Sequence, residues 1–281
     1  MKILIIQENG RHEVSKYLRE CNSMQRAIIS QGVNCDVWGL GHDSYNTKPD
    51  FNSYDVIINL ENYDTGWMPD LCNINKPLKF LWSIDAHVRG YNYYKNVFVE
   101  GNYNYILQAT RDYCDNDSLW FPNCYDDDYL TPLPITKEYF VGFCGNFVNR
   151  KSYFDYISSK MSFKLDIDVR GEHMIKAINS YKIHYNKNIS NDINYRNFET
   201  MGCKTALLTD YNSQYNDLGF VDKQNVFFYK NIDEAIDILY SLKENEEQIT
   251  RIAEEGYILA KKKHTFKKRA ESLLKFINTK I

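Results

Sequence analysis

Several features are absent from the sequence, and each absence narrows the class of protein. No stretch approaches the ~18 apolar residues of a membrane helix, and the apolar start MKILII is too short for a secretory signal. The seven cysteines are scattered and include no C-x-x-C pair, which is typical of reduced thiols rather than a disulfide framework. A formal net charge of -3 gives no overall attraction to nucleic acid or acidic membranes. We therefore expect a soluble cytoplasmic protein.

Metal-binding spacings are also missing from the sequence. The six histidines form no H-x-x-H pair and stand beside no paired carboxylates of the kind that would bind a metal ion. We therefore expect chemistry that uses no bound metal. The oligomeric state has no signature in the sequence.

Short apolar runs alternate with helical patterns in the first half of the chain. Residues 14–30 carry apolar side chains at helical spacing. Such alternation is typical of a parallel sheet covered on both faces. The runs that predict strands are 2–6, 34–38, 55–60, 79–84 and 96–100.

The segment 122–134, PNCYDDDYLTPLP, predicts a domain boundary because it holds three of the six prolines and three consecutive aspartates. The pattern then restarts with YFVGFCGN (139–146) and a helix from about 150. Further strands are expected at 163–169, 182–185, 205–209 and 225–229, and helices at 231–242, 245–262 and 265–278. The sequence thus predicts two α/β domains, 1–133 and 134–264.

Residues 182–210 predict a ligand-binding β-α-β unit. The strand-like KIHYN enters the polar loop KNISND, a helix with Arg196 and Glu199 on one face follows, and MGC leads into the strand TALLTD. Such a loop offers backbone N–H groups and a helix N-terminus to an anion, beside a carboxylate and a guanidinium one turn apart. These groups suit a nucleotide.

Four segments, in this order, give the chain a family resemblance: LWSIDAHV (81–88), WFPN with YFVGFCGNFVNR (120–150), NDINYRNFETMGCKTALLTDY (191–211) and HTFKKRAESLL (264–274). The chain resembles GT-B glycosyltransferases of the group 1 type with a spore-maturation-like C-terminal nucleotide-sugar domain, most strongly from 139 to 270. The resemblance implies two Rossmann-like domains facing across a cleft, with the acceptor bound by the first domain and the nucleotide sugar by the second. It also implies that the last helix, 265–281, packs back on the first domain.

The implied activity is metal-independent and retaining transfer of a hexosyl or pentosyl group from a UDP- or GDP-sugar. The acceptor hydroxyl would belong to a glycan, a small molecule or a modified DNA base, and in that last case the chain would act in host cytoplasm if phage-encoded. No permanently bound cofactor is implied. The alternative is a non-catalytic protein that binds sugar nucleotides.

The resemblance assigns most of the donor site to the second domain. Glu199 matches the second glutamate of the family's E-x7-E motif, which holds the ribose hydroxyls. The alternative is a glutamate on the solvated face of a helix, without a role in binding. The first glutamate falls at Asn191, so the motif is broken here. Asn191 or Asp192 would touch the donor, or Asp192 would cap a helix beginning near Ile193. Asn186, which ends the preceding strand, completes this part of the set.

Two arginines are candidates for binding the diphosphate. Arg196 would clamp it, unless it only forms an ion pair with Glu199. Arg150 follows the turn at Gly145 and Asn146, where glycine permits close backbone approach and the next helix directs its N-terminus at the anion. The alternative for Arg150 is a surface arginine.

Candidate acceptor and catalytic residues follow strands of the first domain. Asp85 and His87 come after the buried run KFLWSI, and either could take the acceptor proton. The alternative is a turn in which Asp85 caps the next helix. Glu8, Asn9 and Gly10 end the first strand and are candidates for contact with the acceptor.

Two segments permit a nucleic-acid interpretation. The basic run KKKHTFKKR (261–269) would contact phosphates, but glutamates flank it and a solvated helix face is the simpler interpretation. The tyrosine-rich stretch 90–105 could stack on bases, although only Arg89, Lys95 and Arg111 lie close to it in the sequence.

Overall fold

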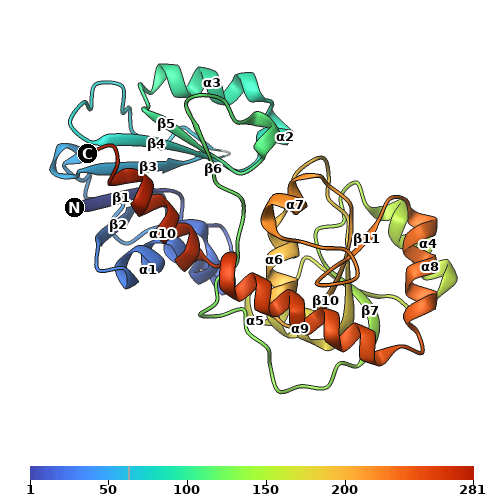
Figure 1. Cartoon of the computed structure of the whole chain (residues 1–281). Helices are drawn as coiled ribbons and strands as arrows, with labels where there is room; N and C mark the ends of the chain where they lie inside the picture. Colours follow the sequence, from blue (N-terminus) through green and yellow to red (C-terminus); the bar gives the residue numbers. More distant parts are fainter. Residues whose placement is uncertain (63) are drawn as a thin grey trace. The chain divides into compact units, whose positions relative to one another are not determined.

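The chain forms two compact α/β units, seen in the computed structural model that describes residues 1–62 and 64–281 (Figure 1). Unit 1 comprises Met1–Pro122 and Phe266–Ile281, and unit 2 comprises Asn123–Thr265. The first division therefore falls at the start of the proline-rich segment 122–134, whereas the predicted domain limit was at its end. The predicted class, α/β with two parallel sheets, is confirmed.

Unit 1 is built on a six-stranded parallel sheet in the order β2-β1-β3-β4-β5-β6. Its central strands are buried on both faces, which explains why they read as continuous apolar runs. The strands are β1 (Lys2–Ile6), β2 (Asn34–Trp38), β3 (Val56–Leu60), β4 (Leu78–Ser83), β5 (Tyr105–Gln108) and β6 (Ser118–Trp120).

The helices of unit 1 cover the two faces of this sheet, with α3 on one face and α1 packed against α10 on the other (Figure 1). The remaining helical segments are short and precede or follow the strands. Their bounds are η1 (Glu13–Leu18), α1 (Glu20–Ser30), η2 (Phe51–Ser53), α2 (Ala86–Arg89), α3 (Tyr91–Glu100), η3 (Arg111–Tyr113) and α10 (Phe266–Ile277).

The predicted strand at 96–100 is wrong, because these residues form the last turns of α3. Tyr94 is buried, and Val97 and Phe98 pack against the same apolar core, so the contacts recur at helical spacing. The β-branched and aromatic composition of NVFVE masked this periodicity. The strands β5 and β6, which follow β4 in the sheet, were not predicted from the sequence.

Unit 2 is built on a five-stranded parallel sheet in the order β11-β10-β9-β7-β8. Its apolar core joins the inward side chains of these strands to helices α4, α8 and α9. The strands are β7 (Tyr139–Gly145), β8 (Lys164–Ile167), β9 (Tyr181–Asn186), β10 (Ala206–Asp210) and β11 (Phe227–Tyr229).

Asparagine side chains cap three helices of unit 2, where they accept hydrogen bonds from backbone N–H groups of the first turn. Asn194 caps α6, Asn231 caps α8 and Asn245 caps α9. The helices are α4 (Lys151–Lys160), α5 (Gly171–Ser180), α6 (Tyr195–Gly202), α7 (Gln214–Leu218), α8 (Ile232–Leu242) and α9 (Glu246–Lys263).

The structure bears on two expectations from the sequence, which concern membrane-spanning helices and the state of the cysteines. Within residues 1–62 and 64–281, no helix combines the length and the apolar character that crossing a membrane requires. All seven cysteines are free thiols, and five of them are buried. Burial raises the pKa of Cys21 and of Cys144 to about 12, which makes these thiols poor nucleophiles.

Candidate functional site

The candidate donor site lies at the carboxyl ends of β7 and β9. The chain passes from β7 to β8 on one side and then returns to place β9 on the other side of β7. This reversal is a topological switch point, where the two loops that leave the strands diverge and open a crevice at the sheet edge. The side chains that follow β7 and β9 are therefore the first place to look for a ligand.

Gly145, Asn146 and Arg150 form the β7 side of this site. Gly145 has a φ of +154°, which L side chains rarely adopt, and an added Cβ would lie 3.2 Å from the Phe143 ring. Arg150 is buried rather than exposed on the surface, and it occupies the N-cap position of α4. Its Nη1 donates to the carbonyl of Asn146 at 2.9 Å, and burial lowers its pKa.

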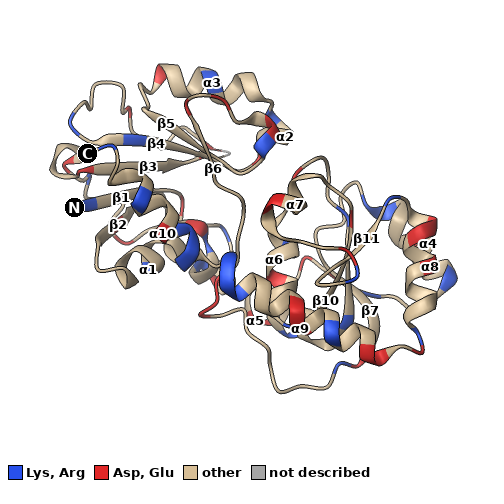
Figure 2. Ribbon diagram, viewed as in Figure 1, with Lys and Arg blue, Asp and Glu red and all other residues tan. Residues whose placement is uncertain are grey.

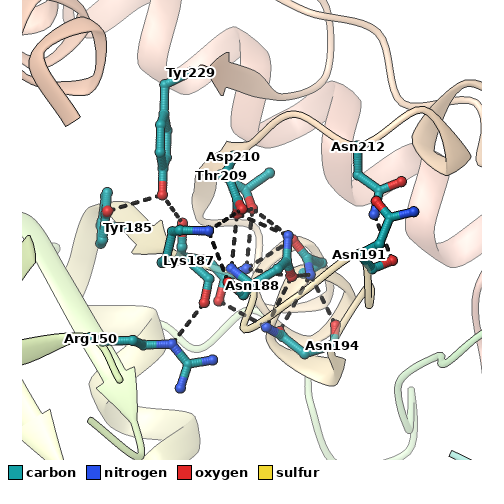
Figure 3. A network of polar contacts seen from close by, with 12 residues as sticks. Arg150, Tyr185, Lys187, Asn188, Asn191, Asn194, Thr209, Asp210, Asn212 and Tyr229 are labelled. Carbon is teal, nitrogen blue, oxygen red and sulfur yellow. Dashed lines mark hydrogen bonds and ion pairs between the residues drawn. The ribbon is translucent and has the colours of Figure 1, made fainter. Parts of the chain in front are cut away.

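Arg150 also connects the two loops of the switch point. Its Nε donates to the carbonyl of Lys187 at 2.7 Å, so the guanidinium reaches from α4 to the loop after β9 (Figure 3). The arrangement brings Gly145, Asn146, Arg150 and Asn186 together at one sheet edge, as adjacent parallel strands require.

A network of buried polar side chains fixes the loop after β9 (Figure 3). Asn188 is at its centre: its backbone N–H donates to Asp210 Oδ1 at 2.8 Å and its Nδ2 to the Tyr215 hydroxyl at 2.9 Å. Its Oδ1 accepts from Asn194 and Asn197 at 3.0 and 3.1 Å. Such a satisfied network holds the loop in one conformation.

Lys187 and Asp210 add charge to this network. The Lys187 ammonium contacts Asp210 Oδ2 at 2.6 Å and donates to the Asn188 carbonyl at 2.9 Å. Asp210 ends β10, the strand paired with β9, so its carboxylate meets the β9 loop at the same sheet edge. Asn186 lies within the network too, since its Nδ2 donates to Thr209 Oγ1 at 3.1 Å.

The loop passes into α6 through Asn191, Asp192 and Asn194. Asn194 is the N-cap of α6, two residues beyond Asp192, so the interpretation of Asp192 as the cap is wrong. Asp192 is buried, whereas Asn191 is exposed and its backbone carbonyl accepts from Asn212 and Gln214, both at 2.7 Å.

Arg196 and Glu199 form an ion pair one turn apart on α6, so the pairing that the sequence left as an alternative is present. Arg196 also donates through Nε to the carbonyl of Cys144 at 2.8 Å, which ties α6 to the end of β7. Both side chains keep partial exposure, 22% for Arg196 and 13% for Glu199. A ligand at the switch point would therefore meet a fixed guanidinium and a fixed carboxylate.

His184 supports this arrangement from inside the sheet. Its Nε2 accepts from the backbone N–H of Cys144 at 2.9 Å, so Nδ1 carries the proton and donates to Thr200 Oγ1 at 2.5 Å. Burial lowers the pKa of His184 to about 3, and the nearby Arg196 guanidinium contributes. The imidazole is therefore a neutral structural link between β7, β9 and α6.

A second group of candidates lies at the carboxyl ends of β1, β3 and β4 in unit 1. Glu8 donates its backbone N–H to Asn62 Oδ1 at 3.3 Å, and Asn22 donates to Asn9 Oδ1 at 3.0 Å. Gly10 has a φ of +81°. Unit 1 has its own switch point between β1 and β3, and these residues border it.

Asp85 and His87 follow β4, beside a carboxyl group that the sequence analysis did not identify. Asp85 occupies the N-cap position of α2 without a side-chain cap bond, and its backbone N–H donates to Glu61 Oε1 at 2.7 Å. Burial raises the pKa of Glu61 to about 7, and the Asp85 carboxylate adds to the effect. Burial lowers the pKa of His87, and Asp85 opposes that shift.

The side chains that organise both sites were not predicted from the sequence. Asn188, Asn194, Asn197 and Asp210 belong to the unit 2 network, and Glu61 belongs to unit 1. Asp210 and Glu61 carried a usable signal, because each ends or directly follows an apolar strand run. The asparagines gave no such signal in the sequence, since polar loops commonly contain this residue.

The basic run 261–269 spans the end of α9 and the start of α10 (Figure 2). Arg269 is buried and donates through Nε to the carbonyl of Pro122 at 2.8 Å. Lys268 pairs with Glu271 at 2.9 Å. These contacts give the run a structural role and reduce the positive charge that it offers to phosphates.

No group of three or more His, Cys, Asp or Glu side chains that could hold a metal ion occurs in the part of the chain that the structure describes. The positive groups near the candidate donor site are Arg150, Lys187 and Arg196. Cationic side chains of this kind can offset the charge of a diphosphate.

Comparison with known proteins connects this geometry to a family. Residues 153–275 match the family model described as glycosyl transferase-like. No curated protein sequence matches the chain. The matched residues include α6 with Arg196 and Glu199, and most of the network around Asn188.

Solved structures match the whole chain. Sucrose-phosphate synthase from Thermosynechococcus elongatus has a TM-score of 0.71 at 8% identity, covering 99% of this chain and 98% of that one. Anabaena HepE, solved with UDP and glucose, has a TM-score of 0.70 at 9% identity and 99% coverage of both chains. The T4 phage β-glucosyltransferase has a TM-score of 0.67 at 17% identity and 98% coverage of both.

At these identities the structural matches establish the fold, and the family model adds the sequence relationship over 153–275. The predicted resemblance to GT-B glycosyltransferases is confirmed on both grounds. Together, the glycosyl transferase-like sequence of residues 153–275 and the fold of the whole chain make the chain similar to glycosyltransferases of the GT-B fold.

Proposed function

We propose that the chain transfers a sugar from a nucleoside-diphosphate sugar, with UDP-sugars as the first candidates, to an acceptor hydroxyl. Structures of similar fold support the choice of UDP, since HepE was solved with UDP-glucose and the DNA-modifying β-glucosyltransferase with and without uridine diphosphoglucose. The observation that carries the proposal is the switch-point site of unit 2, with Arg150, Arg196 and Glu199 at one sheet edge.

In this proposal Glu199 accepts hydrogen bonds from the two ribose hydroxyls, a role for which a carboxylate with several lone pairs is suited. The ion pair with Arg196 and the bond from Arg196 to Cys144 hold both side chains in place before the donor binds. Gly145, Asn146, Asn186, Asn191 and Asp192 complete the proposed donor set. Pre-ordered groups lose little entropy when the ligand arrives.

During transfer, the bond between the anomeric carbon and the diphosphate oxygen breaks, and the acceptor oxygen forms the new bond to that carbon. The diphosphate leaves with the electron pair, and we assign its stabilisation to Arg150 and Arg196 without a metal ion. The acceptor proton passes to Asp85 or His87. The group 1 resemblance supports retention of the anomeric configuration, although the first glutamate of the motif is absent.

The proposed division of labour gives the acceptor to the first domain, predicted as 1–133 and found as unit 1. It gives the donor to the second domain, predicted as 134–264 and found as unit 2. Glu8, Asn9 and Gly10 are the proposed acceptor contacts at the end of β1. Cytoplasmic location is part of the same proposal and is supported by seven free thiols.

A non-catalytic sugar-nucleotide-binding protein is the rival from another class. Both proteins would bind UDP, so the deciding measurement is UDP release from a panel of UDP- and GDP-sugars, with water or an added hydroxyl compound as acceptor. We expect catalysed UDP release. Tight binding of UDP without release from any donor would favour the rival, and absence of nucleotide binding would overturn both.

A modified base in DNA is a second candidate acceptor, because a DNA-modifying glucosyltransferase is among the structures of similar fold. Duplex DNA requires several phosphate contacts by Lys and Arg. In the tyrosine-rich stretch, Lys95 is paired with Asp115 and Asp117, and Arg89 stacks on Tyr93. This charge pattern favours a glycan or small-molecule acceptor over DNA.

A further inference from the structure

A cavity of about 460 Å³ lies in unit 1 between the sheet and α3. Its floor is buried and includes Asn59 of β3, Leu81 of β4 and Tyr94 of α3. Its rim is exposed and includes Thr65, Asp70, Tyr93 and Glu100. A volume of this size is typical of small-molecule sites, and the exposed rim leaves the floor open to a ligand.

The cavity walls are held in place by buried contacts. The Lys79 ammonium donates to the carbonyls of Leu71 and Gly101, at 2.8 and 3.1 Å, and both of these residues line the cavity. Asn59 donates through Nδ2 to the Tyr103 hydroxyl, which links β3 to the segment before β5. The cavity is therefore a built feature of the unit rather than a gap between mobile side chains.

Two residues that line the cavity carry hydrogen-bond acceptors, Asn59 and Glu61. Asn59 is 1% exposed, and within residues 1–62 and 64–281 its Oδ1 has no hydrogen-bond partner. Glu61 lines the same cavity. Its Oε1 accepts a hydrogen bond from the backbone N–H of Asp85. A buried acceptor without a partner is unfavourable, and a ligand that donates a hydrogen bond to it removes that penalty.

The remaining lining specifies what kind of donor fits. Tyr93, Tyr94 and Tyr103, with Met68 and Leu71, offer apolar and aromatic faces of the kind that pack against the C–H faces of a sugar ring. Glu61, Asp70 and Glu100 place carboxylates around the cavity, against one guanidinium from Arg89. A phosphate-bearing ligand would be repelled, whereas an apolar ligand would leave the floor acceptors unsatisfied.

We propose that this cavity is the acceptor subsite and that it binds a neutral pyranose ring, whose hydroxyls donate to Asn59 Oδ1 and to the Glu61 carboxyl. The proposal rests on the glycosyltransferase function proposed above and narrows the acceptor class to a glycan or a free sugar. Glu61 also contacts the backbone of Asp85, so a sugar in this cavity would lie beside the proposed catalytic residues.

The test uses the full chain with methyl glycosides of glucose, galactose, mannose and N-acetylglucosamine. Binding is measured by saturation-transfer NMR without donor, and turnover is measured as UDP release from UDP-glucose and other UDP-sugars. We expect at least one glycoside to bind and to accelerate UDP release. Glu61→Gln should raise KM for that glycoside about tenfold, as expected for the loss of a charge-assisted hydrogen bond, with UDP affinity unchanged.

Two further variants make the test specific. Tyr93→Ala removes an exposed rim side chain without touching the core, and should raise KM for the glycoside by a few-fold. Glu13→Gln is the matched control, because Glu13 is an exposed glutamate of unit 1 that does not line the cavity, and it should behave as the wild type. Circular dichroism establishes that each variant is folded.

The outcomes separate this inference from the proposed function. Hydrolysis of a UDP-sugar without binding of any glycoside would overturn the cavity assignment and leave glycosyl transfer intact. Acceleration by duplex DNA carrying hydroxymethylated cytosine, with all glycosides inert, would also overturn it. Failure to bind or hydrolyse any donor would overturn the proposed function; glycoside binding weakened by Glu61→Gln would still support the cavity as a sugar site.

Discussion

The two units treat their buried polar groups in opposite ways. At the edge of the unit 2 sheet, Asn188 makes hydrogen bonds to side chains from β9, β10, α6 and α7, and Arg196 is paired with Glu199. In unit 1, Asn59 and Glu61 line a cavity, and Asn59 Oδ1 has no hydrogen-bond partner among the described residues. Both edges lie at the carboxyl ends of parallel strands. The two units therefore differ in whether their buried polar side chains have hydrogen-bond partners, and not in topology.

This difference suggests a division between a rigid site and a site completed by its ligand. A satisfied network fixes the groups that must meet a diphosphate, which lowers the entropic cost of binding. An unsatisfied buried acceptor penalises the empty site and rejects ligands that cannot donate to it. We expect donor binding to depend on the integrity of the network and acceptor choice to depend on the cavity.

A histidine in each unit shows the same difference in hydrogen bonding. His184 in unit 2 has both ring nitrogens bonded, and its pKa is lowered to about 3. His87 in unit 1 has no hydrogen-bond partner for Nδ1 among the described residues, although burial lowers its pKa as well. His184 is therefore committed to the fold, whereas His87 keeps a buried ring nitrogen without a partner among the described residues.

The largest effect is expected from the proposed acceptor base in unit 1. Asp85→Asn or His87→Ala should lower kcat by about 10²–10⁴, because proton transfer stabilises the transition state, and should leave UDP affinity nearly unchanged. Steady-state kinetics and calorimetry measure the two quantities. Near-normal turnover in both single variants would remove the catalytic assignment from this part of unit 1.

Asn188→Ala should lower the free energy of unfolding by about 3 kcal/mol, because it leaves buried partners in the unit 2 network without their hydrogen bonds. The matched control is Asn191→Ala in the same loop, where the side chain is exposed and the bonds from Asn212 and Gln214 use the backbone carbonyl. Its cost should stay within about 0.5 kcal/mol. Equal destabilisation of both variants in urea would contradict the role given to the network.

Glu199→Ala should weaken UDP binding by about 1.5–3 kcal/mol, the contribution of hydrogen bonds to a charged group. Calorimetry with UDP and GDP measures the loss in a variant whose folding is checked by circular dichroism. Glu246→Ala is the control, since Glu246 of unit 2 is exposed and paired with Lys182 on a different element. Unchanged nucleotide affinity in the folded Glu199→Ala variant would show that Glu199 does not bind the ribose hydroxyls.

Glu61 should make stability fall as pH rises, which is unusual for a glutamate. Its folded pKa of about 7 lies above the ordinary value of 4.5, so the folded state binds the proton more tightly between these pH values. The loss should reach about 2 kcal/mol, allowing for partial exposure. Urea unfolding at pH 4.5 and pH 8 should show this loss in the wild type but not in Glu61→Gln; identical pH dependence would contradict the assignment.

The smallest expected effect is that of metal removal. We expect turnover to survive exhaustive dialysis against EDTA, because Arg150 and Arg196 take the role of a cation at the diphosphate. The comparison between untreated and dialysed enzyme, with added Mg²⁺ or Mn²⁺ as the control, measures this. Complete loss that either metal restores would count against the proposed donor site.

Local sequence determined the elements whose side chains repeat at a clear period. The runs KILII and DVIINL are apolar throughout, as strands buried on both faces must be, and Arg196 and Glu199 meet because residues three apart on a helix are neighbours. The prolines and consecutive aspartates of 122–134 likewise lie in the sequence, and the chain divides within this segment. The stretch 96–100 was misread because aromatic and β-branched residues suit both a strand and a packed helix face.

Tertiary structure alone decided which polar residues act together. Asn188 meets Asp210 and Tyr215 because β9 and β10 pair in parallel and end at one edge, and Glu61 meets Asp85 because β3 and β4 do the same. Each of these pairs is separated by more than twenty residues in the chain. Hydrogen bonds over such separations depend on strand order and register, which arise from the packing of the whole sheet and leave no periodic pattern in the sequence.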